Sequence, residues 1–342
     1  MRSWIIAIAT MLSIGLVGPA WSARAADTKI KKTENETVLR AYDVMGMNVR
    51  NAQGEKLGDI KDLMVEMGQH PRVRYAALDF GGFLGVGDKL FAVPWQAMKL
   101  RHDAKDNNRA FLELDATKES LKNAPGFDKN HWPSMADTRW TDEVHKHYRV
   151  ETPHAKIDVN APRGKVDVNT PGAKVDVDVN RKNGEKPQNK TPQNNTANAE
   201  ANRKNGATAD DDQLTALMRR ASKVEGIEVK NESDQKIGKV EDLVLDVASG
   251  ELRYVAISFG GFLGVGDKLF AVPMDAVMFE HDGKDKQDCL VFDVNKETLS
   301  NAQGFDKDHW PNFGDPKWSA ENRKHYQKDI DRAASRAKQR RG

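Results

Sequence analysis

Cysteine is nearly absent from this chain of 342 residues, in which Cys289 is the only one. A single cysteine cannot form an intrachain disulfide, so the fold depends on its hydrophobic core alone. Cys289 lies in the apolar run Cys-Leu-Val-Phe, and the corresponding place in the internal repeat described below holds Ala110 or Phe111. We therefore expect Cys289 to be a small buried side chain and not a nucleophile.

Long hydrophobic runs are missing as well, except for one near the start. The residues from Trp4 to Gly18 are almost all apolar, Arg2 precedes them, and residues 23–25 read Ala-Arg-Ala. A run of this length is shorter than the roughly 20 residues that cross a bilayer, and it fits a secretory signal peptide. We predict a signal peptide over residues 1–25, with an uncleaved anchor as the alternative. No cysteine follows the run, so the expected product is periplasmic or secreted and is not a lipoprotein.

The chain also lacks an excess of one sign of charge, since its formal net charge is +2. The repeated modules mix both signs, which does not favour specific nucleic-acid binding. Only residues 328–342 form a basic tail, and we expect a solvated helix end that can touch anionic surfaces. No large apolar residue follows Ile330, so the tail is not expected to enter a membrane.

Signatures of catalysis and of cofactor binding are missing too. No serine or cysteine recurs in both modules beside a histidine and an acid, and no paired carboxylates stand out in apolar surroundings. The glycine-rich run from Gly81 to Lys89 differs from a phosphate-binding loop, because Asp88 places negative charge at the phosphate position and a strand follows. We expect a protein that is not an enzyme and binds no cofactor.

Histidines offer the only route to a metal site, and the route is weak. A carboxylate and a histidine stand three residues apart in each module, and this spacing can bring two ligands to one side of a turn. Two ligands do not make a site, so His147 or His325 would have to supply a third. The weak candidates are Asp128, His131, Asp306 and His309.

What the chain does contain is an exact repeat of fifteen residues. The sequence FGGFLGVGDKLFAVP runs from Phe80 to Pro94 and again from Phe259 to Pro273. It lies inside two longer stretches that match more loosely, over residues 38–150 and 216–327. Each stretch, here called module 1 and module 2, is long enough for its own core.

Residues 151–215 between the modules have a different composition. Lys-Val-Asp-Val motifs recur every nine residues, and residues 181–209 are rich in Asn, Lys, Gln and Thr. Such a segment cannot bury enough apolar surface to offset its ordering entropy, and we predict a long disordered or extended linker, with a small β addition as the alternative. A coil of about sixty residues spans on the order of 40 Å. The modules can therefore reach each other without being forced to dock.

Within a module the pattern is mainly β. Alternating or apolar runs bounded by turn residues predict strands over 57–66, 73–80, 89–93, 98–101 and 109–114 in module 1. Thr117 is a plausible N-cap of a following helical turn, with Ser120 at its third position. Short strands at this spacing indicate a small barrel or sandwich with a short helical tail.

Several separated motifs occur in the same order in both modules. In module 1 they are Gly58-Asp59-Ile60, Tyr75, the glycine-rich run, Ala92-Val93-Pro94-Trp95 and a downstream Gly-Phe-Asp-Lys with His-Trp-Pro. In this combination each module resembles the PRC-barrel domain, with the tail that often follows it in exported bacterial proteins. The resemblance implies a mainly β fold of two small six-stranded barrels. It also implies protein contacts without chemistry, as in the photosynthetic reaction-centre H subunit and a ribosome-maturation factor. The chain has neither the membrane helix of the first nor the partner domain of the second.

We therefore predict a non-catalytic, exported interaction or scaffold protein, whose barrels bind each other, sister molecules or an envelope partner. The alternative is a protein that binds a small ligand or an envelope polymer. The apolar side chains of the glycine-rich run either plug a barrel end or form an exposed contact patch. The candidate patch comprises Phe83, Leu84, Val86, Lys89, Phe262, Leu263, Val265 and Lys268.

Overall fold

The fold is that of a computed structural model, which describes residues 37–80, 89–103, 106, 109–133, 137–151, 217–259, 268–281, 287–294 and 296–339. The predicted signal peptide, all of the predicted linker but Glu151, and residues 81–88 and 260–267 of the two glycine-rich runs lie outside these residues. Within the described part no helix is both long and apolar enough to cross a membrane.

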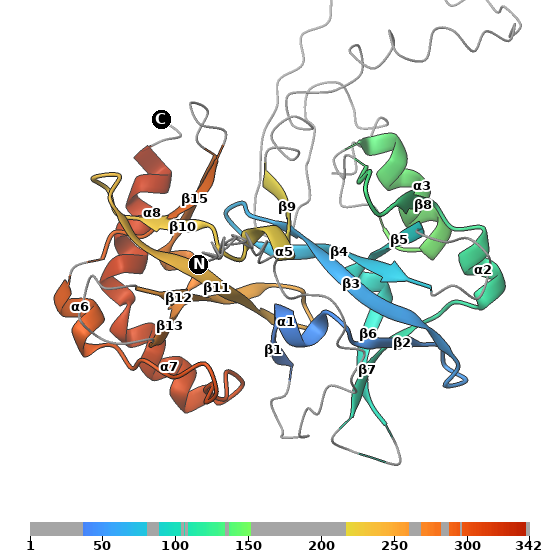
Figure 1. The fold of residues 1–342 in the computed structure, drawn as a ribbon, viewed down its shortest axis with the longest axis horizontal. Coiled ribbons are helices and arrows are strands. Elements are labelled where there is room, and N and C mark those ends of the chain that lie inside the picture. Colours follow the sequence, from blue (N-terminus) through green and yellow to red (C-terminus); the bar gives the residue numbers. More distant parts are fainter. Residues whose placement is uncertain are drawn as a thin grey trace, which may run out of the picture.

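Each module forms one curved sheet with helices after it (Figure 1). In module 1 the strand order is β6-β7-β2-β3-β4-β5-β8, and in module 2 it is β13-β12-β11-β10-β15-β14. The strands of module 1 are β2 (Asn48–Arg50), β3 (Lys56–Glu66), β4 (Arg72–Asp79), β5 (Lys89–Pro94), β6 (Met98–His102), β7 (Ala110–Leu114) and β8 (Gly126–Asp128). Those of module 2 are β10 (Glu228–Lys230), β11 (Lys236–Asp246), β12 (Leu252–Ser258), β13 (Leu269–Pro273), β14 (Met278–His281) and β15 (Asp288–Val291).

These bounds confirm the predicted strands of module 1 to within one or two residues. The helical turn is confirmed as α2 (Lys118–Lys122), where the Thr117 side chain accepts from the backbone N–H of Ser120 at 3.1 Å and the Ser120 side chain accepts from that of Thr117 at 3.0 Å. Cys289 is buried, as expected. The local pattern was therefore sufficient to place these elements.

Each module has the expected curved β-sheet, but its strands do not close into the expected six-stranded barrel among the described residues. Among the described residues the strand pairing follows an open path that ends at β6 and β8 in module 1, and at β13 and β14 in module 2. Irregularities in the pairing of β3 with β4, between Ile60 and Asp62 and between Met64 and Val65, recur at the equivalent places of β11. Bulges of this kind bend a sheet, so the sheets curve without completing a cylinder of backbone hydrogen bonds.

A glycine in the long strand of each module permits a close backbone contact. A Cβ on Gly58 would lie 2.1 Å from the carbonyl oxygen of Asp79, and one on Gly238 would lie 2.4 Å from that of Ser258. Neither distance is possible for a side-chain carbon, so any other residue would push the neighbouring strand away. This explains why the Leu57-Gly58 and Ile237-Gly238 motifs share only the glycine.

Aromatic tails cover one face of each sheet. In module 1 the rings of Phe127 and Trp132 lie 4.8 Å apart, and α3 (Thr138–Tyr148) packs on β5. The Tyr75 hydroxyl lies 3.1 Å from Nε2 of His145 on that helix, and burial raises the pKa of Tyr75 to about 12. In module 2, α6 (Lys296–Asn301) comes first, then α7 (Pro316–His325) packs on β13 and α8 (Gln327–Gln339) packs on the short turn Met274–Ala276.

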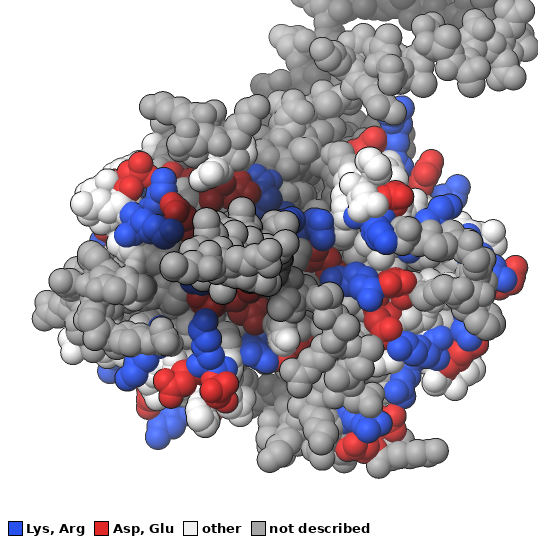
Figure 2. Space-filling view, in the orientation of Figure 1, with Lys and Arg blue, Asp and Glu red and all other residues white. Residues whose placement is uncertain are grey.

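The two modules share one hydrophobic core. A single continuous cluster of buried side chains contains Val65, Val73 and Trp95 of module 1 together with Leu245 and Leu252 of module 2. The space-filling view shows Lys, Arg, Asp and Glu interspersed over the described part of the visible face (Figure 2). The modules are thus docked largely through apolar surface, and charges of both signs are interspersed over the described part of the visible face.

Candidate interaction interface between the two modules

Each module donates its first strand to the sheet of the other. Strand β1 (Val38–Arg40) of module 1 pairs antiparallel with β11, and β9 (Met218–Arg220) of module 2 pairs antiparallel with β3. We call β1 and β9 the guest strands. Arg40 lies opposite Val244, and Arg220 lies opposite Met64, which is the residue of module 1 equivalent to Val244. The two exchanges therefore have the same register and are related by an approximate two-fold symmetry.

The site for a guest strand exists because β3 and β11 are longer than their neighbours. Strand β2 pairs only with residues 56–59 of β3, so the edge of Met64–Glu66 is left for β9. An unpaired edge of backbone N–H and C=O groups is a template for another strand. The chain then crosses to its own module in a single helical turn, α1 (Ala41–Val44) or α5 (Ala221–Val224).

A second contact joins the hairpin turns of the two long strands. The backbone N–H of Val73 donates to the carbonyl of Gly250 at 2.8 Å, and that of Leu252 donates to the carbonyl of Pro71 at 2.9 Å. The indole N–H of Trp95 reaches across to the carbonyl of Val247 at 3.0 Å. Gly250 has a φ of +77°, and its missing side chain leaves room for Trp95.

A buried carboxylate in module 1 binds the end of guest strand β9. Asp62 is 1 % exposed. It accepts hydrogen bonds from Nε of Arg220 at 2.8 Å, from the hydroxyl of Ser222 at 2.5 Å and from the backbone N–H of Ser222 at 3.2 Å. A buried charge is stable only when it is paired and hydrogen-bonded. Asp62 meets that condition through these groups of the other module together with the backbone N–H of Leu63 in its own strand, at 2.9 Å.

The equivalent carboxylate in module 2 has fewer partners. Asp242 is also buried and accepts from the backbone N–H of Tyr42 at 3.3 Å, but Tyr42 stands where module 2 has Ser222. Arg40, the equivalent of Arg220, makes two hydrogen bonds of 2.6 Å with Asp43 instead. Burial raises the pKa of Asp242 to about 7, against the opposing attraction of Arg40. The two ends of the interface therefore differ in their electrostatics.

The repeated His-Trp-Pro motif of the tails contributes to the same contact. The guanidinium of Arg220 lies 4.2 Å from the ring centroid of Trp132, and that of Arg40 lies 4.6 Å from the ring centroid of Trp310. Trp132 packs in turn on Phe127. Cation–π contacts of this geometry are favourable. Each tail tryptophan thus holds the arginine of the guest strand that arrives from the other module.

Comparison with protein families agrees with this architecture. The model of the PRC-barrel domain matches residues 36–120 and 217–299. The chain carries two tandem PRC-barrel domains. No curated protein matches the chain. Each PRC-barrel match begins at a guest strand, so β1 and β9 belong by sequence to one PRC-barrel domain and by backbone pairing to the other. Trp132 and Trp310 lie in the tails, outside the matched residues.

The predicted contact patch is mostly outside the described residues. Phe83, Leu84, Val86, Phe262, Leu263 and Val265 all fall there. Lys89 and Lys268 are described, and both are exposed. Lys89 begins β5 opposite Asp128 of β8. The position of the patch relative to the interface therefore falls outside the described residues.

The weak metal candidates form turns. Nδ1 of His131 lies 3.4 Å from the carboxylate of Asp128, and both side chains are largely exposed. Asp306 and His309 are joined by a backbone hydrogen bond. The proposed third ligands lie elsewhere, since His147 packs on Tyr148 and His325 faces the carbonyl of Thr298. Within the described part of the chain, no three His, Cys, Asp or Glu side chains converge as metal ligands would.

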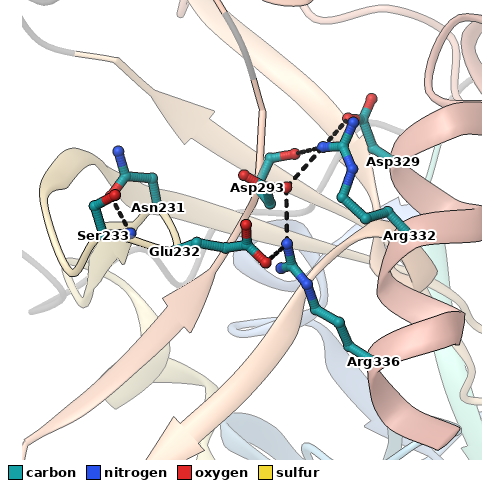
Figure 3. Close-up of polar contacts among 7 residues, drawn as sticks. All are labelled: Asn231, Glu232, Ser233, Asp293, Asp329, Arg332 and Arg336. Carbon is teal, nitrogen blue, oxygen red and sulfur yellow. Dashed lines mark hydrogen bonds and ion pairs between the residues drawn. The ribbon is translucent and has the colours of Figure 1, made fainter. Parts of the chain in front are cut away.

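Part of the predicted basic tail is bound to module 2 as helix α8 (Figure 3). Arg332 and Arg336 both donate to the carboxylate of Asp293, at 2.8 and 2.7 Å, and Arg336 also pairs with Glu232. Ile330 and Ala333 lie on the buried face of the helix. Two of the tail's arginines therefore serve to fix α8 to its own module.

Sequence reasoning missed the residues that hold the modules together. Asp62 and Asp242 stand at equivalent places in strands that mix charged and apolar residues, and each is followed by an apolar run of three residues that begins with a leucine. A charged residue repeated within a buried strand needs a partner, and this was the available signal. Nothing in the sequence around Arg40 or Arg220 identified which strand either residue would join.

Proposed function

We propose that the protein is an exported, non-catalytic scaffold in which two PRC-barrel domains act as one protein-binding unit. The observation that carries the proposal is the reciprocal exchange of guest strands. The most specific contacts of each module, a buried carboxylate and a tail tryptophan, are directed at the other module and not at a cavity. Such contacts serve to build a rigid pair.

A rigid pair suits a partner with two equivalent binding surfaces. Each module carries the same glycine-rich sequence, and an approximate two-fold relation between the modules presents both copies on one particle. Joining two weak sites in one body raises the overall affinity well above that of either site. We therefore expect the partner to be an envelope protein that contacts both glycine-rich runs at the same time.

Crosslinking in cells tests this role. The wild-type chain and a variant with Phe83→Asp and Phe262→Asp would be compared for what each captures, with Lys99→Asp plus Lys317→Asp as a control on exposed lysines. We expect the hairpin variant to lose the crosslinked partner while its thermal unfolding is unchanged, and the lysine control to keep the partner. Capture that is equal for all three proteins contradicts the proposed surface.

Export is tested separately, by the intact mass of the protein recovered from the cell envelope. Cleavage after Ala25 predicts a chain that begins at Ala26. A full-length chain found only in the cytoplasm would exclude the exported role. The alternative of ligand binding is tested by thermal shift with envelope polysaccharides and small metabolites, where a saturable rise in the unfolding temperature would favour it.

A further inference from the structure

We propose that the guest-strand sites also accept a second copy of this chain, so that module 1 of one copy docks on module 2 of another. This inference goes beyond the scaffold role, because it concerns self-assembly and needs no outside partner. It rests on the interface between the modules and would hold whether or not the protein is exported.

The chemistry of the site does not depend on which copy supplies the strand. The edge of β3 offers backbone groups, Asp62 binds an arginine and a serine hydroxyl, and Trp132 stacks on the arginine. Residues 217–222 supply all of these partners. A second copy presents the same residues in the same order, and it therefore satisfies the site equally well.

The residues that make these contacts all lie outside the connection between the modules. The chain leaves module 1 at Glu151, whose carbonyl is bound by His145, and it is next described at Leu217, whose carbonyl is bound by Met67 of the same module. The positions from 152 to 216 lie between these two points. These positions join the two modules in one chain, and none of the contacts cited above involves them.

The effective concentration of one module around the other in the same chain determines when exchange occurs. A short flexible connection gives an effective concentration in the millimolar range at most, and a longer one gives less. Pairing within one chain therefore prevails in dilute solution, and pairing between chains rises with concentration or when two chains refold together. Two chains that exchange both modules satisfy all four guest-strand sites, which gives a closed dimer and not a fibre.

A disulfide that can form only between copies provides the test. Glu66 and Met218 lie directly opposite each other in the β3–β9 ladder. In a Cys289→Ala background, one copy would carry Glu66→Cys and the other Met218→Cys, and the two would be unfolded together, refolded at high concentration and oxidised. A chain with both substitutions is the control, because it can close the bond within itself.

We expect the mixture to give a covalent dimer of two different chains on a non-reducing gel, while each copy refolded alone gives only background dimer. Native mass spectrometry of the wild-type chain refolded in the same way should show the mass of two chains. The proposal is overturned if the mixture stays at background while the control chain closes its disulfide.

A charge exchange gives independent evidence on the same point. Asp62→Arg in one copy and Arg220→Asp in the other break the ion pair within each chain, but a dimer of the two restores opposite charges at both β3–β9 contacts. At a concentration at which the wild-type chain is monomeric, we expect the mixture to form a one-to-one dimer and a single chain with both substitutions to remain monomeric. Mixtures that contain only monomers would argue against exchange between copies.

Discussion

Arg220 of module 2 donates a hydrogen bond of 2.8 Å from its Nε to the carboxylate of Asp62 in module 1. The carboxylate is buried, while the arginine is partly exposed and stacked on Trp132. Because a buried charge depends on its partners, module 1 is complete only when the first strand of module 2 is in place. The predictions below follow from this dependence.

Neutralising the buried carboxylate should weaken the docked pair. Asp62→Asn removes the charge that Arg220 and Ser222 bind and brings amide hydrogens toward their donors. We expect a loss of about 3–5 kcal/mol in the free energy of unfolding, the range for breaking a buried ion pair. Urea denaturation measures it. Asp234→Asn is the matched control, because Asp234 pairs with Lys230 at an exposed site, where the loss should stay below about 1 kcal/mol. Equal losses in the two variants would contradict the assigned role of Asp62.

The other carboxylate should make stability depend on pH. The pKa of Asp242 is raised to about 7 in the folded chain, whereas an unfolded aspartate has a pKa of about 3.9. The unfolded state therefore loses the proton first, so the contribution of Asp242 is fully present below about pH 4 and is lost as the pH rises through about 7. Urea denaturation of the wild type and of Asp242→Asn at pH 5 and at pH 8 measures this. We expect the variant to gain stability relative to the wild type as the pH rises. Parallel profiles would show that Asp242 does not titrate in this range.

The turn contact should be intolerant of a side chain at Gly250. Gly54 and Gly250 have nearly the same φ, +78° and +77°, so both substitutions to alanine carry the backbone strain of a left-handed conformation. A Cβ on Gly250 would also lie 2.6 Å from Trp95, while one on Gly54 meets nothing within 4 Å. We expect Gly54→Ala to cost about 1 kcal/mol and Gly250→Ala clearly more. Thermal or urea unfolding compares them, and equal costs would show that the turns are not in close contact.

The tail tryptophan and the guest arginine should be energetically coupled. Trp132→Leu removes the ring on which Arg220 stacks, and Arg220→Lys keeps the charge but loses the planar group that stacks and that binds Asp62. In a double-mutant cycle we expect a coupling of about 0.5–2 kcal/mol. The control cycle pairs Trp132→Leu with Lys223→Ala, which changes a residue on the same short segment. A coupling that is no larger for Arg220 than for Lys223 would argue that the stacking contributes nothing.

Local sequence predicted strands β3 to β7 and the helical turn α2 of module 1 well, and for identifiable reasons. The alternation of Val73–Phe80 and the capping residues Thr117 and Ser120 act over a few positions, and the structure contains β4 and α2 where they were expected. The guest strands were not predicted, since β1 and β9 are only three residues long and carry no extended alternation. Their position is determined by backbone hydrogen bonds, which any residue except proline can make.

The sequence by itself determined that one module occurs twice, that each resembles a PRC-barrel domain, and where the strands of module 1 and the cap of α2 lie. These features depend on short-range sterics and on burial within a module. Only the tertiary structure decided that the modules pair, because pairing depends on the free edge that β2 leaves on β3 and on the charge of Asp62 buried beside it. The edge and the charge lie on the same strand, β3, and the strand that completes them, β9, belongs to the other half of the chain.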